Sequence, residues 1–437
     1  MRQAGAASLA RDAIRSPTVQ TFLINALVLG LGLISSVQLA RWLGPGGRGE
    51  LAAAALWPML LMYLASMGMI QSVLYFSALP GAEPGKVLGT ALACAGVQSV
   101  LAMGIGYVVL PLLLAKQVPA VVAVSRIFLW VIPVSLISQY CLSVLQAQLR
   151  FSAYNAIRLV IPVGYVVSVI ALERARALTP SAAVLAMLWL NVAVLVATVA
   201  TLWWSHTVAH VAPDRTLAVP MLKYGGKVNA GSLPQTANLR LDQALLAAWF
   251  PPVQLGLYVA AVSAVSVAEV LSTAVRTVIT PRIAQQEPTA GARALQDAFR
   301  KYWVVSLAGT VLLGVVLPFA IPLVYGPSFS GAIPPAMVLL GASICFGATQ
   351  VLSGGAQALG NPWLASKADI IGAVVTVISL PFLLPKFGIM GAAVATLAAY
   401  ATQLIVVLYG LSRTHSIWPR SLVSFGTPQW RTASEER

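Results

Sequence analysis

The clearest candidates for chemistry in this 437-residue chain are ionisable side chains inside long apolar segments. In the segment that begins near Gly256, Glu269 and Arg276 are seven residues apart and therefore share a helix face. They belong to a polar stripe with helical spacings of three and four: Ser266, Glu269, Ser272, Thr273, Arg276 and Thr280. Two interpretations stay open, because the pair could line a water-filled space or form a salt bridge that holds helices together.

The preceding apolar segment, which begins near Tyr224, carries an even heavier polar load. Its polar residues are Lys227, Asn229, Gln235, Asn238, Arg240 and Asp242. At about 100° per residue, Asn229 and Arg240 fall on one side of a helix and Asp242 on the other, so Arg240 and Asp242 cannot pair directly. We expect Lys227, Asn229 and Arg240 to face a cavity, with Asp242 either structural or carrying a proton.

A milder polar stripe occurs twice. Gln139 and Gln146 recur as Gln350 and Gln357, each 211 residues later. Together with small residues they form the sets Ser135, Gln139, Ser143, Gln146 and Gly347, Gln350, Gly354, Gln357. These sets could form symmetric walls of one cavity, with Gln139 and Gln350 binding substrate. The alternative is interhelical hydrogen bonding and small-residue packing.

The elements that position these residues are membrane helices. The mean hydropathy is +0.85 and only 9% of residues are charged, whereas soluble domains carry about 25%. We count twelve apolar runs, each long enough to cross roughly 30 Å of hydrocarbon as a helix. Because the bilayer cannot satisfy backbone polar groups, the predicted class is an all-α integral membrane protein.

The two halves of the chain repeat each other. Residues 39–54 (LARWLGPGGRGELAAA) and 246–261 (LAAWFPPVQLGLYVAA) lie 207 residues apart and share turn signals between two apolar runs. Coincident pairs include Trp42 with Trp249, Pro45 with Pro252 and Gly49 with Gly256. Six spans in each half make the halves parallel repeats, with a cavity between them.

Charge predicts the topology. With the N-terminus in the cytoplasm, 17 Lys and Arg residues fall in cytoplasmic segments and six on the opposite side, which favours two cytoplasmic termini. The expected parts are a cytoplasmic N-terminus (1–17), a six-helix half (18–205), a cytoplasmic linker (206–223), a second six-helix half (224–412) and a cytoplasmic tail (413–437). The net charge of +15 reflects this topology and attraction to lipid head groups, so no nucleic acid is expected.

Other motifs exclude several function classes. The turn at residues 43–49 lacks the ending of a phosphate-binding P-loop and reads as a tight hairpin. His206 and His210 have metal-ligand spacing without further ligands, so we expect no metal. The three cysteines provide no disulfide framework. Without a catalytic triad or a large extramembrane loop, the chain is not expected to be an enzyme or to need a cofactor.

Several motifs spread along the chain resemble a known family. These are residues 39–51, Asn238-Leu239-Arg240-Leu241-Asp242-Gln243, Gly256-Leu257-Tyr258, Tyr325-Gly326 and Gln357-Ala358-Leu359-Gly360-Asn361. They are similar to the bacterial oligosaccharide flippases that handle lipid-linked O-antigen and capsule units. That family is the polysaccharide transporter branch of the multidrug/oligosaccharidyl-lipid/polysaccharide exporter superfamily. The resemblance implies two six-helix halves in a V that opens to one side at a time.

The resemblance also implies a substrate. An oligosaccharide on undecaprenyl pyrophosphate would pass from the cytoplasmic to the periplasmic leaflet of the bacterial inner membrane, for surface polysaccharide biosynthesis. The protein would work as a monomer beside polysaccharide assembly proteins. Interior cations (Arg41, Arg240, Arg276, Lys227) suit such an anion. Two alternatives remain, a multidrug antiporter coupled to protons or cations through Asp242 or Glu269, and a lipid II flippase.

Overall fold

The computed structural model describes residues 17–205 and 210–415, and this part of the chain is helical with no strand. The first half contains α2 (Pro17–Ser66), α3 (Met69–Ala78), α4 (Pro84–Leu113), α5 (Pro119–Phe128), α6 (Val131–Ala147), α7 (Phe151–Arg174) and α8 (Pro180–Trp204). The second half contains α9 (Arg215–Trp249), α10 (Pro252–Val265), α11 (Glu269–Ala284), α12 (Pro288–Tyr325), α13 (Ile333–Ala358), α14 (Pro362–Phe387) and α15 (Ile389–His415). Short 3-10 segments at Ser266–Ala268 and Pro327–Ala332 complete it.

The helices match the expected membrane crossings. Within the described residues, nine helices are long and apolar enough to span a membrane, or ten when the bent pair formed by α10 and α11 counts as one. A kink at Gly44, whose φ is 68°, divides α2 into two crossings where a tight hairpin was expected. Helix α9, the expected crossing that begins near Tyr224, is more polar than these helices and is not among them, and with it the described part of the chain has the expected twelve crossings.

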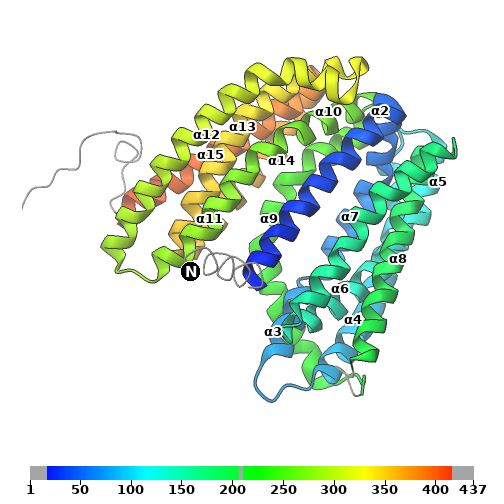
Figure 1. The fold of residues 1–437 in the computed structure, drawn as a ribbon, viewed down its shortest axis with the longest axis vertical. Helices are drawn as coiled ribbons and strands as arrows, with labels where there is room; N and C mark the ends of the chain where they lie inside the picture. Colours follow the sequence, from blue (N-terminus) through cyan, green and yellow to red (C-terminus); the bar gives the residue numbers. More distant parts are fainter. Residues whose placement is uncertain (1–16, 206–209, 416–437) are drawn as a thin grey trace, which may run out of the picture.

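The two halves form a V (Figure 1). They converge where α2 meets α10 and spread apart toward the other end, with α9 between them. We call the converging end, which carries residues 41–50, 247–256 and 323–332, the closed end. The opposite end, which carries residues 66–90, 204–205 and 210–225, is called the linker end.

The duplicated turns touch each other at the closed end. A Cβ atom added to Gly49 would lie 1.7 Å from the carbonyl oxygen of Pro252, and one added to Gly256 would lie 1.9 Å from the carbonyl oxygen of Pro45. These are equivalent residues of the two repeats in reciprocal contact. The pseudo-two-fold axis that relates the halves therefore passes between Gly49 and Gly256.

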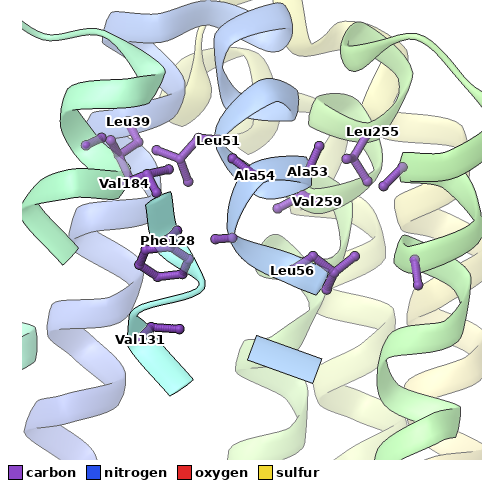
Figure 2. Packing of buried hydrophobic residues seen from close by; sticks show 14 of the residues in the cluster. Leu39, Leu51, Ala53, Ala54, Leu56, Phe128, Val131, Val184, Leu255 and Val259 are labelled. Atoms are coloured by element: carbon purple, nitrogen blue, oxygen red, sulfur yellow. The ribbon is translucent and has the colours of Figure 1, made fainter. Parts of the chain in front are cut away.

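Small residues let the second segment of α2 approach its neighbours closely. Ala53 and Ala54 are almost fully buried. Figure 2 shows this segment between Leu255 and Val259 of α10 on one side and Phe128 of α5 on the other. Large apolar side chains on α4 and α12 are instead exposed, as expected of surfaces that face lipid.

Helix α9 starts against the first half. Asp214 caps its N-terminus by accepting hydrogen bonds from the backbone N–H and the hydroxyl of Thr216, which lower the pKa of the Asp214 carboxyl. Because α9 begins at Arg215, residues 215–223 of the expected linker are helical. The hydroxyl of Ser72 then donates to the carbonyl of Met221 at 2.6 Å, and Tyr224 stacks on Tyr75.

The rest of α9 packs on the second half. Asn238 donates to the carbonyl of Asp369 on α14 at 3.1 Å and accepts a hydrogen bond from Thr376 at 2.9 Å. Helix α9 therefore contacts both halves. A movement of one half relative to the other must change how α9 packs. Two hollows flank α9, one of about 430 Å³ against α4 and one of about 320 Å³ against α14.

Candidate functional site

Asp242 is the most deeply buried acid of the expected site, with 4% of its surface exposed. Its carboxylate accepts hydrogen bonds from the hydroxyl of Tyr258 on α10 at 2.6 Å and from that of Thr396 on α15 at 3.3 Å. It also accepts one from the backbone N–H of Gln243 at 2.6 Å. Three helices of the second half thus meet at one carboxylate.

Arg240 does not pair with Asp242, as the helix geometry predicted. Its side chain is exposed, and it makes no ion pair or hydrogen bond with the described residues. The two ion pairs in residues 17–205 and 210–415 are Lys86–Glu83 and Arg300–Asp297, each between neighbours on one helix or at its end. The guanidinium of Arg240 therefore has its donors available.

Arg276 has a protein partner. Its guanidinium donates a hydrogen bond to the side-chain oxygen of Gln350 on α13. The glycines of the same α13 stripe receive neighbouring side chains: a Cβ at Gly354 would lie 2.9 Å from Cγ of Arg276, and one at Gly347 would lie 2.0 Å from the hydroxyl of Tyr302. For these three α13 positions, the geometry is that of small-residue packing and interhelical hydrogen bonding.

The stripe that contains Glu269 does not lie on one straight helix. The 3-10 segment Ser266–Ala268 precedes Glu269, and α10 and α11 are bent by 42° at this break. The stripe's hydroxyl groups (Ser266, Ser272, Thr273 and Thr280) donate to backbone carbonyls three or four residues back. Glu269 is half-buried and is in neither of the two ion pairs found in the described segments.

Several charged side chains of the expected site have one neighbour in common, Tyr400 on α15. The charges of Asp242, Glu269, Asp369 and Arg240 all interact with its buried phenol. Charged side chains of α9, α11 and α14 therefore lie within electrostatic range of one ring. We call the following residues the polar cluster: Arg240, Asp242, Glu269, Arg276, Asp369, Tyr258, Thr396 and Tyr400. Asp369 also interacts with Arg276, which connects Arg276 to the other residues of the polar cluster.

Sequence reasoning missed Asp369 although a signal was present. It lies one residue into the apolar run that begins near Ala368, and an ionisable residue in a membrane helix is a candidate functional residue by default. The tyrosines carried no such signal, because their position beside the carboxylates depends on how the helices pack.

Arg41, expected in the cavity, is at the closed end instead. It donates to the carbonyls of Val324 at 2.6 Å and Leu323 at 2.5 Å, at the C-terminal end of α12. Gln117 likewise donates to the carbonyls of Ala247 and Phe250, at the end of α9. Both side chains come from the first half and satisfy helix ends of the second, so they fasten the closed end.

The remaining expected residues are dispersed. Gln139 lies in the first half, where its amide approaches the sulfur of Met62 at 3.6 Å. Lys227 is exposed and Asn229 is half-buried, both on α9 nearer the linker end than Arg240. His206 lies outside the described residues, and in residues 17–205 and 210–415 no group of His, Cys, Asp and Glu could hold a metal ion.

Comparison with known proteins places this geometry in a family. Residues 17–287 match the family described as polysaccharide biosynthesis protein. One relative, described as probable low-salt glycan biosynthesis flippase Agl15 of Haloferax volcanii, is 26% identical over 185 residues, which are 40% of this chain. The match spans 38% of that relative's length.

Solved structures share the fold over nearly the whole chain. A lipid II flippase MurJ in an inward closed conformation has a TM-score of 0.77 at 14% identity, covering 90% of this chain and 87% of that one. An inward-facing multidrug resistance MATE family transporter of the MOP superfamily has a TM-score of 0.75 at 13% identity, covering 89% and 94%. The chain is thus a multi-pass membrane protein with this transporter fold, and it belongs to the polysaccharide biosynthesis protein family.

Proposed function

We propose that the protein is a flippase for an oligosaccharide linked to undecaprenyl pyrophosphate. It moves this lipid from the cytoplasmic to the periplasmic leaflet of the bacterial inner membrane by alternating access, for surface polysaccharide biosynthesis. Family membership, the relative described as a glycan biosynthesis flippase and the shared fold with a lipid flippase support this assignment. The protein acts as a monomer, beside polysaccharide assembly proteins.

The position of Arg240 is the observation that carries the proposal. It lies nine residues before the end of α9 at Trp249, which puts it about 14 Å along the helix from the closed end. That depth is well inside a hydrocarbon layer roughly 30 Å thick. An exposed guanidinium there is costly against lipid, so Arg240 faces the space between the halves. Its planar donors suit a bidentate contact with a diphosphate.

The other candidate residues take secondary roles in this scheme. Lys227 and Asn229 lie along α9 between Arg240 and the linker end, where they can contact the diphosphate or sugar hydroxyls during entry. Arg276 adds positive charge while it remains bonded to Gln350. The apolar tail of the substrate stays in the bilayer.

The closed end faces the periplasm in this scheme, because the charge bias places the linker end in the cytoplasm. The structure is then inward-facing, ready to load from the cytoplasmic leaflet. To release substrate outside, the protein has to break the contacts of Arg41 and Gln117 with the helix ends of the second half. The contact between Gly49 and Gly256 must loosen in the same step.

Asp242 is the group we assign to coupling, with Glu269 as the second. As a carboxylate, Asp242 accepts from Tyr258 and Thr396 and so links α9 to α10 and α15. Protonation from bulk water, or a bound cation, changes which of these bonds can persist. Uptake of either ion would thereby change how α9 packs on its half.

Two related functions compete with this one. Acidic side chains at Asp242, Glu269 and Asp369 favour a cation- or proton-coupled multidrug antiporter as the second candidate, since acids attract cationic drugs. A lipid II flippase differs only in the sugar attached to the diphosphate. Efflux of cationic dyes by cells that carry the protein, unaffected by Arg240→Ala, would identify the antiporter.

The test in cells is the export of surface polysaccharide. Arg240→Ala should abolish export with protein abundance near normal, and Arg240→Lys should restore it only in part, since ammonium cannot form the bidentate contact. Arg174→Ala, at an exposed position at the end of α7, is the matched control. Normal export by Arg240→Ala would refute the role. If Arg240→Ala lost protein abundance in parallel with export, Arg240 would instead be a structural partner of a carboxylate. Glu269 would be the first carboxylate to test by charge swap.

A further inference from the structure

A second arginine, Arg48, is packed into the closed end. Its Nη2 donates to the hydroxyl of Ser36 at 3.3 Å, and its Nε is buried without a hydrogen-bond partner among the described residues. The phenols of Tyr165 on α7 and Tyr325 on α12 are close enough to interact electrostatically with its guanidinium. The hydroxyl of Ser36 also lies close to the phenol of Tyr325. We call these four residues the Arg48 cluster.

The Arg48 cluster has donors and no carboxylate. Neither ion pair of the described segments involves Arg48. A guanidinium provides five N–H donors and no acceptor, and the groups near it here are the hydroxyls of Ser36, Tyr165 and Tyr325. The hydroxyl of Tyr165 is likewise buried without a partner among the described residues. Such a set is complementary to an anion with several acceptor oxygens, such as a phosphate or diphosphate.

The Arg48 cluster spans both halves. Arg48, Ser36 and Tyr165 belong to the first half, and Tyr325 is the last residue of α12 in the second. Arg41 binds the carbonyls just before it. When the closed end opens, Tyr325 must part from Arg48, and the buried Nε of the guanidinium becomes accessible. A guanidinium N–H that is buried without an acceptor or a counter-ion is unfavourable, so an anion that binds it after opening stabilises the open state.

We propose that Arg48 is an anion-binding group that becomes available when the closed end opens and holds the diphosphate of the substrate before release. This inference rests on the proposed function. Arg240 then binds the diphosphate while the linker end is open, and Arg48 binds it while the closed end is open. Because opening exposes the buried Nε of Arg48, an anion binds there more tightly in the open state and shifts the protein toward that state by the difference in affinity.

The test measures the opening of the closed end in purified full-length protein in liposomes. Spin labels go on Trp42→Cys and Trp249→Cys, equivalent positions of the two repeats that are 40% and 41% exposed. Cys94, Cys141 and Cys345 are replaced by alanine. Inorganic pyrophosphate is titrated and the distance between labels is followed by pulsed electron paramagnetic resonance. We expect the population with a longer distance between the labels to grow as the pyrophosphate concentration rises.

Arg48→Gln should raise the pyrophosphate concentration that gives half of the distance change by at least about tenfold, as loss of a charge-assisted contact does. Arg48→Lys should raise that concentration by less. Arg174→Ala, the exposed control at the end of α7, should keep the response. An unchanged concentration dependence in Arg48→Gln would overturn the inference, as would a long distance in Arg48→Gln without any anion, which would make Arg48 a structural latch. Flipping of lipid-linked oligosaccharide is measured in the same liposomes. A wild type that flips but shows no response refutes the inference alone, whereas one that responds through Arg48 without flipping refutes the proposed function alone.

Discussion

Replacing Gly49 by alanine should open the closed end. The added Cβ atom would lie 1.7 Å from the carbonyl oxygen of Pro252. An ordinary contact between a carbon and a carbonyl oxygen is about 3.3 Å, so α2 and α10 must separate by about 1.6 Å. Backbone atoms cannot rotate away as a side chain would, and the separation falls on the contact that relates the two repeats.

The size of the effect follows from two opposing terms. Overpacking of this kind costs about 1–3 kcal/mol. Alanine is a better helix former than glycine by about 1 kcal/mol, which offsets part of it. The net loss in the inward-facing state is then up to about 2 kcal/mol, which lowers its population relative to the open state by up to roughly 30-fold. Gly256→Ala should act in the same way, because its Cβ would lie 1.9 Å from the carbonyl oxygen of Pro45.

The spin labels at positions 42 and 249 provide the assay. Gly49→Ala should shift the distance distribution toward the longer, open-state value without any anion, and should slow transport because return to the inward-facing state becomes unfavourable. Gly46→Ala is the matched control in the same turn, since its Cβ would meet only Val253 at an ordinary 3.7 Å. Distances for Gly49→Ala identical to those of Gly46→Ala would refute the reasoning.

Three further substitutions separate structural from binding roles. Gln117→Ala leaves the carbonyls of Ala247 and Phe250 without their donor, so it should lower the midpoint of thermal unfolding by a few degrees, whereas the exposed Gln285→Ala should leave it unchanged. Arg276→Met removes the donor to Gln350 and should reduce thermal stability more than Arg240→Ala does; equal stability of the two variants would contradict this ranking. Asp242→Asn keeps an acceptor for Tyr258 but removes the charge, so the folded protein should lose the dependence of transport on an ion gradient, unlike the exposed Asp297→Asn; a gradient dependence that survives would exclude Asp242 from coupling.

Local features of the sequence predicted the fold. Apolar runs and helix geometry predicted the crossings, and the repeated turn predicted two related halves. The same turn proved to be the point of contact between the halves, with Gly49 facing Pro252 and Gly256 facing Pro45. Helix α9 was predicted as a crossing in spite of its polar load, and its place among the other helices agrees with that prediction.

The site was less predictable because its contacts are distant in sequence. Arg41 binds carbonyls 282 and 283 residues away, and backbone carbonyls at a helix end leave no distinctive side-chain signal. Helical periodicity did separate Arg240 from Asp242 correctly. It could not show that Gln350 is bonded to Arg276, since that depends on how α11 packs on α13.

The most direct test of the central claim is translocation by the purified protein. Lipid-linked oligosaccharide on a pyrophosphate carrier is placed in liposomes with the protein, and its sugars become accessible to an external glycosidase only after crossing the bilayer. Wild type and Arg174→Ala should render nearly all of the lipid accessible, whereas Arg240→Ala should match protein-free liposomes and Arg240→Lys should be intermediate. Wild-type liposomes no faster than protein-free ones, or full activity in Arg240→Ala, would contradict the account.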